Sequence, residues 1–163
     1  MSTTPSPYAR IRALWERLSP RPGGKWLFSK LLGLSVPYTG SIRPRVVELR
    51  PGYARVEMDD RRAVRNHLRS IHAIALMNLA EAASGLAATT TLPDDARAIV
   101  TGLSIEFVKK ARGHLVAEST AAPMDAREER EHEVEAVIRD AAGDVVARAK
   151  ARWRVGPGTP PAP

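Results

Sequence analysis

The hydrophobic and polar positions of this chain predict two short helices, then strands on either side of one long apolar helix. Apolar residues recur at the spacing i, i+3, i+4 and i+7 in the first segment, at Ile11, Leu14, Trp15 and Leu18. This spacing is typical of an amphipathic helix, which the sequence S-P-R-P-G-G would end. A second apolar helix is expected over residues 25–34, stopping before Pro37.

Strand-like runs occupy most of the remaining chain, at residues 42–50, 53–59, 98–109, 114–121, 129–139 and 145–155. The pair Pro51-Gly52 suits a tight turn between the first two runs, and Gly113 and Gly143 separate later ones. Short connections favour antiparallel pairing. We therefore expect a hairpin, a long helix, and then four strands in a meander.

The long helix, expected over residues 71–88, contains a single carboxylate. Its side chains are nearly all those of Ile, Leu, Met and Ala, and after His72 only Asn78, Glu81 and Ser84 interrupt them. Such a helix is buried on most sides. A carboxylate inside a buried helix costs several kcal/mol unless it is paired, hydrogen-bonded or protonated, so we look for function at Glu81.

Length and composition limit the class of protein. The 163 residues suit one domain with a real hydrophobic core. The absence of cysteine excludes disulfides, thiol catalysis and thiolate metal sites, and we expect no metal. No signal-peptide core and no run of about 18 apolar residues occurs, so we expect a soluble, cytoplasmic protein without membrane insertion.

The net charge of +7 favours an anionic partner. One basic row alternates with apolar residues near the end of the chain, at Arg148, Lys150, Arg152 and Arg154. An acidic row with the same period precedes it, and a hairpin would place Glu135 near Arg148 and Glu133 near Lys150. A row that carries its own acidic partners is a solvated strand face, so we expect no nucleic acid partner.

Asn66, His72 and Glu81 have the spacing N-x5-H-x8-[DE]. With the strand order, this pattern resembles acyl-CoA thioesterases of the phenylacetate-pathway (PaaI-like) type in the hotdog-fold superfamily. The N-terminal helices and the segment V-P-Y-T-G-S-I-R-P are more similar to an uncharacterised branch of that superfamily.

The resemblance implies an α+β hotdog fold, in which an antiparallel sheet wraps around one long central helix. The hotdog domain would cover residues 38–155, and residues 1–37 would form an N-terminal extension of two short helices. The Pro- and Gly-rich residues 156–163 are expected to be a disordered tail.

Thioester hydrolysis needs a positive pole for the carbonyl oxygen and an oriented base or nucleophile. Unpaired amides at the helix start, near His72 and Ala73, supply the first, and the Ala73 amide is the candidate oxyanion donor. Glu81 would act either as general base or as nucleophile. The resemblance gives Asn66 and His72 roles in the site, but a turn-stabilising asparagine and a helix-capping histidine remain alternatives.

Helix geometry separates these groups. His72 and Glu81 are nine residues apart, about 13 Å along the axis at about 1.5 Å per residue, and they face nearly opposite directions. Two antiparallel copies would bring the helix start of one to Glu81 of the other. We therefore expect a homodimer with two shared sites, and the sequence leaves open whether dimers pair into tetramers.

Coenzyme A, as part of the substrate, would use the positive charge, and no separate cofactor is implied. One basic cluster flanks the motif and consists of Arg61, Arg62, Arg65 and Arg69. Another lies beside Gly113 and consists of Lys109, Lys110 and Arg112. Either cluster would bind phosphates by charge-assisted hydrogen bonds or would simply be solvated surface.

Two other functions remain open. The family usually has H-G-G where this chain has His72-Ala73-Ile74, and Gly85 replaces a hydroxyl residue beside Ser84, so a non-catalytic acyl-CoA-binding protein is one alternative. A hydroxyacyl dehydratase that uses His67 with Glu81 is another. The acyl group is not fixed by the sequence.

Overall fold

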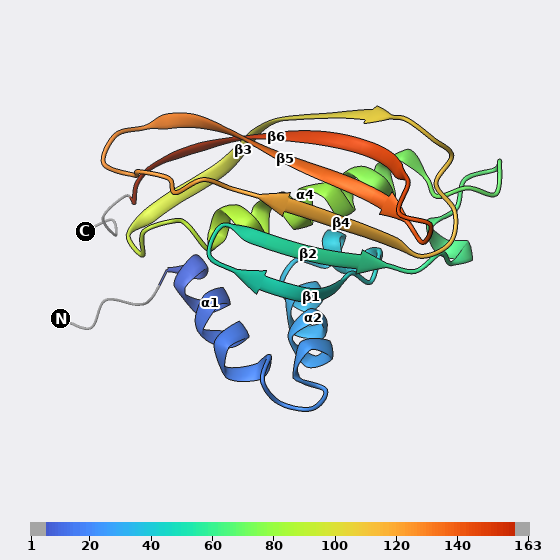
Figure 1. Ribbon diagram of the computed structural model, residues 1–163. Helices are drawn as coiled ribbons and strands as arrows, with labels where there is room; N and C mark the ends of the chain where they lie inside the picture. The colour runs from blue at the N-terminus through green and yellow to red at the C-terminus, as the bar shows by residue number, and fades with distance from the viewer. Residues whose placement is uncertain (1–5, 159–163) are drawn as a thin grey trace.

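The computed structural model describes residues 6–158, and its elements follow the predicted order (Figure 1). The helices are α1 (Pro7–Leu18), α2 (Gly24–Ser35), α3 (Pro37–Ser41) and α4 (Ala73–Thr89), with a 3-10 turn at Arg62–Val64. The strands are β1 (Arg45–Arg50), β2 (Tyr53–Met58), β3 (Ala96–Phe107), β4 (Leu115–Thr120), β5 (Arg130–Asp140) and β6 (Val145–Pro157).

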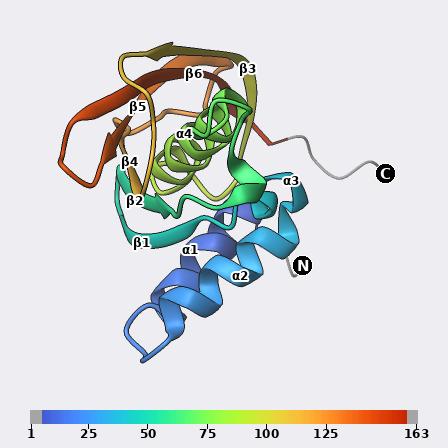
Figure 2. The ribbon, with the colours of Figure 1, turned by 90° about the vertical axis from the view of Figure 1, so that its right-hand side faces the viewer.

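One antiparallel sheet curves around α4, with the strand order β1-β2-β4-β5-β6-β3. Figure 2 looks nearly along α4 and shows the sheet enclosing it, while α3 and β3 lie toward the side that the sheet leaves open. Leu79 and Ala83 of α4 are fully buried against the sheet, because the helix is apolar on most of its faces. The predicted α+β hotdog fold is confirmed.

The predicted meander of four strands is wrong in one position. β4, β5 and β6 pair in succession. β3 pairs with β6 at the far edge of the sheet and does not pair with β4. β3 and β6 are 12 and 13 residues long, whereas β4 has only six, so β6 offers β3 a partner along its whole length. β3 is consequently an edge strand.

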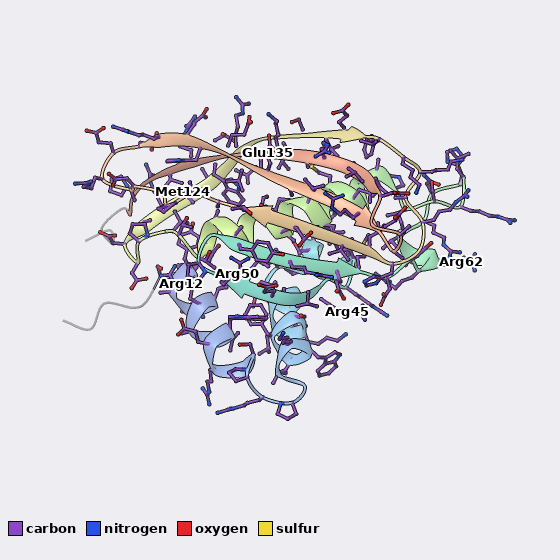
Figure 3. All side chains as sticks on the ribbon, in the orientation of Figure 1. Arg12, Arg45, Arg50, Arg62, Met124 and Glu135 are labelled. Carbon is purple, nitrogen blue, oxygen red and sulfur yellow. The ribbon has the colours of Figure 1, made fainter. Side chains whose placement is uncertain are left out.

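The acidic and basic rows of β5 and β6 face each other, but in a register that differs from the predicted one. Glu135 lies opposite Lys150 and Val137 lies opposite Arg148, two residues from the predicted register, and a bulge between Ile138 and Arg139 accounts for one of these two residues. The predicted Glu135–Arg148 pair is therefore wrong. Lys150 Nζ still lies 2.8 Å from a Glu133 carboxylate oxygen, and Figure 3 shows Glu135 on the outer face of the sheet.

Helices α1 and α2 pack beneath β1 and beside one end of α4 (Figure 1). The rings of Trp15 and Phe28 meet edge to face with their centroids 5.0 Å apart. Arg12 donates from Nη1 to the carbonyl oxygens of Thr89, at 2.7 Å, and Leu92, at 3.1 Å. These bonds satisfy carbonyl groups at the C-terminus of α4, so α1 both covers the core and caps the central helix.

Helix α3 was not predicted; it lies between the second expected helix and the first expected strand. β1 begins at Arg45 instead of Ile42. α3 packs closely against α2 where Gly40 meets Gly33. Glycine is needed at position 40, because a Cβ atom there would collide with the Gly33 carbonyl oxygen. The chain leaves α3 through Arg43, whose φ of 53° is left-handed and unusual for a residue with a side chain.

β6 continues to Pro157 and pairs with β3 there, so residues 156 and 157, which were expected to be part of a disordered tail, belong to a strand. Residues 159–163, which also belong to that expected tail, lie outside the described part of the chain. Between residues 6 and 158, no helix is long and apolar enough to cross a bilayer.

Candidate functional site

Glu81 lines a cavity of about 320 Å³ between α3, α4 and β3. Its other lining residues are mostly apolar: Tyr38, Thr39, Ile74, Met77, Asn78, Val100 and Leu103. The Asn78 side-chain amide donates to the Tyr38 carbonyl oxygen at 3.0 Å and so fastens α3 to α4. α3 thereby forms a wall of the cavity, on the side of α4 that the sheet does not cover.

The Glu81 carboxylate lies in this cavity without a hydrogen-bond donor from residues 6–158. Burial raises its pKa above the ordinary value of a glutamate, because the ionised form loses hydration that no nearby cation replaces. One turn later, the ring of Trp153 fills the space beside Gly85, where an added Cβ atom would lie 3.2 Å from the ring. Trp153 thus occupies the space that a side chain at position 85 would take.

The start of α4 provides an amide that is free to bind a ligand. His72 is the N-cap, and its Nδ1 accepts a hydrogen bond from the Ile74 amide at 3.1 Å. The Ala73 amide has no acceptor within the described residues, and Ala73 is exposed. This geometry favours a capping role for His72. The Ala73 amide, together with the helix macrodipole, is available to stabilise a developing negative charge.

Asn66 holds the loop before α4 in shape. Its Oδ1 accepts hydrogen bonds from the amides of Leu68, at 2.9 Å, and Ser70, at 3.2 Å, and from the Ser70 hydroxyl at 3.2 Å. Its amide nitrogen makes no hydrogen bond within residues 6–158. The oxygen of Asn66 therefore has a structural role, whereas its nitrogen is available to a water or a substrate.

The variant Asn66→Asp separates these two roles. An aspartate keeps the acceptor that the loop needs, so its free energy of unfolding should stay within about 0.5 kcal/mol of the wild type, whereas Asn66→Ala should lose about 1–2 kcal/mol. The aspartate cannot donate, so we expect the thioester hydrolysis that the sequence resemblance implies to slow about tenfold or more. Urea unfolding and a thiol-release assay measure the two effects. Hydrolysis at the wild-type rate by Asn66→Asp would assign Asn66 to the loop alone.

Asn66 and Ala73 line a second cavity, of about 360 Å³, together with Phe107, Lys109 and Lys110. Neither residue lines the cavity of Glu81, and His72 lines neither cavity. The groups expected to act on one thioester are thus in two places on a single chain. His67 is exposed and lines neither cavity, so it does not meet Glu81 within the chain.

The basic residues expected to bind phosphate are distributed over several environments. Arg65 Nε lies 2.6 Å from Asp60, and Lys109 Nζ lies 2.7 Å from both Asp140 and Asp144, so these two cations have carboxylate partners. Lys110 borders the cavity of Asn66 and Ala73, while Arg62 lies at one end of the molecule in Figure 3. Arg112 is exposed near Asp60.

Arg61 differs from these residues, because it lines a third cavity with residues of α2 and Arg43. No periodic pattern of residues predicts that cavity. No group of three or more His, Asp or Glu side chains within residues 6–158 is placed to hold a metal ion.

Solved structures with this arrangement define the class of protein. A crystal structure of the genomics target APC5556 is 33% identical, with a TM-score of 0.79 over 91% of this chain and 98% of that one. The protein PA5026 of Pseudomonas aeruginosa, described as of unknown function and "Probable Thioesterase", is 25% identical, with a TM-score of 0.70 over 79% and 93%. The thioesterase HI1161 of Haemophilus influenzae is 11% identical, with a TM-score of 0.68 over 77% and 87%, and shares the fold. The chain is thus a hotdog protein of the thioesterase superfamily.

Within that class, the chain belongs to the family described as "Domain of unknown function (DUF4442)", which matches residues 24–155. The match includes α2, so this helix is shared with the family even though the sequence assigned it to an extension. No curated protein matches the chain.

Proposed function

We propose that this protein is an acyl-CoA thioesterase whose active site is shared between two copies of the chain. The observation that carries the proposal is Glu81, a half-buried carboxylate that receives no hydrogen bond from the described residues and faces an apolar cavity in a hotdog fold. A raised carboxylate pKa brings a general base closer to its operating pH, and such groups cluster at active sites. The thioesterase names of the structural neighbours support the same chemistry.

The dimer would form along β3, the free edge of the sheet. This strand is 12 residues long, and Leu103 and Phe107 on it are 44% and 51% exposed. Ile74, in the first turn of α4, is 53% exposed. A long apolar edge strand is a template for pairing with another chain. Pairing across a twofold axis would cover these side chains and bring the cavity of Ala73 toward the partner's cavity of Glu81.

Placing a charge in this surface should therefore dissociate the dimer. We expect Leu103→Lys to have the mass of one chain in light scattering and to lose most of its activity, because the lysine ammonium would have to be desolvated in the interface. Leu27→Lys is the matched control, since Leu27 of α2 is 41% exposed and lies away from β3. A Leu103→Lys protein that stays dimeric, or a wild type that is monomeric while fully active, would exclude this interface.

The proposed reaction consumes water and releases a carboxylic acid and a thiol. As general base, Glu81 takes a proton from water while the oxygen of that water bonds to the thioester carbonyl carbon. The negative charge then develops on the carbonyl oxygen, where the Ala73 amide of the other copy donates to it. Collapse breaks the carbon–sulfur bond, and Glu81 returns the proton to the leaving thiolate. As nucleophile, Glu81 would instead bond to the carbonyl carbon and expel the thiolate, which takes a proton from solvent, and water would then hydrolyse the resulting mixed anhydride to the acid and free Glu81.

An assay with a panel of acyl-CoAs tests the function directly. Short, medium, long and aromatic acyl groups would be offered, and the free thiol of coenzyme A would be measured. We expect release above background for at least one class of acyl group. Binding without thiol release would support the non-catalytic acyl-CoA-binding alternative, for which His72-Ala73-Ile74 in place of H-G-G is the sequence argument.

A further inference from the structure

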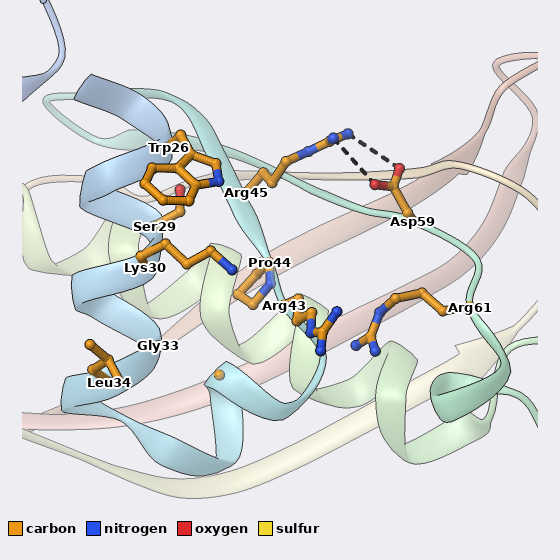
Figure 4. A pocket seen from close by; sticks show the side chains of 11 residues that line it. Trp26, Ser29, Lys30, Gly33, Leu34, Arg43, Pro44, Arg45, Asp59 and Arg61 are labelled. Atoms are coloured by element: carbon orange, nitrogen blue, oxygen red, sulfur yellow. Dashed lines mark hydrogen bonds and ion pairs between the residues drawn. The ribbon is translucent and has the colours of Figure 1, made fainter. Parts of the chain in front are cut away.

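A third cavity, of about 420 Å³, lies on the opposite flank of α3 from the residues that line the Glu81 cavity, between α2 and the start of β1 (Figure 4). Gly40 of α3 lines it, whereas the preceding Tyr38 and Thr39 line the cavity of Glu81. We call it the arginine pocket; its charged and aromatic residues are Trp26, Lys30, Arg43, Arg45, Asp59 and Arg61. Its volume lies within the range of about 300–1,000 Å³ that small-molecule sites occupy.

The arginine pocket has an excess of positive charge. Asp59 is its one carboxylate, and both oxygens of Asp59 lie 3.2 Å from guanidinium nitrogens of Arg45. Lys30, Arg43 and Arg61 have no carboxylate within ion-pair distance among residues 6–158. The pocket therefore offers three cations whose charge the described chain does not neutralise.

Arg43 and Arg61 point toward each other across the pocket in Figure 4. Burial lowers the pKa of Arg61, and the charge of Arg43 lowers it further. Two guanidinium groups that face each other repel, and an anion between them would convert the repulsion into attraction. Guanidinium groups are also the side chains best shaped to bind a phosphate with two parallel hydrogen bonds.

The Arg61 side chain and the backbone of Arg43 are held in place before any ligand binds. Arg61 donates from Nη2 to the Ser41 carbonyl oxygen at 2.9 Å, and its buried Nε has no acceptor within residues 6–158. Arg43 keeps its left-handed backbone, with its amide donating to Gly40 at 3.0 Å. An unpaired buried donor costs stability, and a ligand that accepts from Arg61 Nε would offset that cost.

An aromatic ring borders the cations. The indole of Trp26 is 60% exposed, and Lys30 Nζ lies 5.6 Å from its ring centroid. An exposed indole provides a flat surface on which a nucleobase can stack. We propose that the arginine pocket binds a nucleotide, with its phosphate between Arg43 and Arg61 and its base against Trp26.

The nucleotide could come from two sources. One is the nucleotide end of an acyl-CoA substrate, and this version of the inference rests on the proposed function. The other is a free nucleotide, and that version does not depend on the proposed function. The probe is adenosine 3′,5′-bisphosphate, titrated into the full-length protein by calorimetry and by tryptophan fluorescence. We expect saturable binding that Arg43→Asn weakens about 10- to 100-fold, the usual effect of losing charge-assisted hydrogen bonds. Asparagine tolerates a left-handed backbone, so the melting temperature of this variant should not fall.

The matched control is Arg21→Gln, which removes one exposed positive charge from the turn between α1 and α2. It should bind the probe as the wild type does. Lys30→Gln provides a second test, with weaker binding expected. The inference is overturned if the wild type does not bind the probe, if Arg43→Asn binds it unchanged, or if the protein binds phosphatidylglycerol vesicles that the probe cannot displace.

Kinetics with an acyl-CoA then separate the sources. A higher KM at constant kcat in Arg43→Asn, with competitive inhibition of the wild type by the probe, shows that the arginine pocket binds the nucleotide end of the acyl-CoA substrate. Probe binding with an unchanged KM identifies a separate nucleotide site. If the protein binds the probe but releases no thiol from any acyl-CoA, the proposed function fails while the nucleotide site stands.

Discussion

Replacing Glu81 by glutamine is expected to lower kcat/KM about 100- to 10,000-fold, the usual contribution of a positioned general base. Glutamine has nearly the same shape and cannot accept a proton, so binding of the acyl chain in the cavity should change little. A thiol-release assay measures the loss. Glu16→Gln is the control, because Glu16 is an exposed glutamate of α1 far from the cavity. Equal rates for Glu81→Gln and the wild type would exclude Glu81 from the chemistry.

The same substitution should raise stability at neutral pH, by about 1 kcal/mol, as is common when strained functional groups are removed. Since burial raises the pKa of Glu81 in the folded state, the folded protein binds a proton there more tightly than the unfolded chain, whose value is near 4.5. The ionised carboxylate therefore destabilises the wild type progressively as the pH rises through the raised folded pKa. The advantage of glutamine should be present at pH 8 and absent below about pH 4. Urea unfolding at both pH values measures it.

Replacing Ala73 by proline is expected to lower kcat about 100- to 1,000-fold, the effect of removing one oxyanion donor, without loss of stability. Ala73 is the first residue of α4, where proline is favoured because its missing amide hydrogen has no partner in the helix. His72 has φ −66° and ψ 140°, which suits a residue before proline. The control Ala73→Ser keeps the amide and should hydrolyse at a rate near that of the wild type.

Hybrid dimers of these two variants would decide whether the site is shared. In a dimer of one Glu81→Gln chain and one Ala73→Pro chain, a shared arrangement leaves one site intact and the other doubly altered. The hybrid should then recover about half of the wild-type activity, although each parent has almost none. If each chain contained its own complete site, every site in the hybrid would carry one defect, and purified hybrid would be no more active than its parents.

The sequence predicted the elements well, because hydrophobic period and turn residues are local signals. It misplaced β3, because the alternation of apolar and polar residues along a strand predicts which face is buried but not which strand lies beside it. A usable cue was length: the runs at residues 98–109 and 145–155 were among the longest expected strands, and long strands pair best with each other. The register of Glu135 was wrong by two residues, and one of them comes from a bulge that carries no sequence pattern of its own.

The candidate site was predicted only in part, because the sequence shows local patterns and not contacts between distant segments. A carboxylate in an apolar helix is visible in the sequence, and so Glu81 was found. The wall that α3 forms was not, because five residues are too few to show a helical period. The arginine pocket combines residues from α2, the segment before β1 and the segment after β2, and nothing in the order of the sequence links Lys30, Arg43 and Arg61.

The contact between Gly33 and Gly40 shows how selectivity in this fold can change at a distance. Any side chain at Gly40 would push α3 away from α2, and α3 supplies Tyr38 and Thr39 to the cavity of Glu81. Neither glycine lines that cavity. A single added methyl group between these two helices would therefore reshape the cavity of Glu81 while leaving every lining residue the same, so a comparison of lining residues alone would not reveal whether two members of the family have cavities of the same shape.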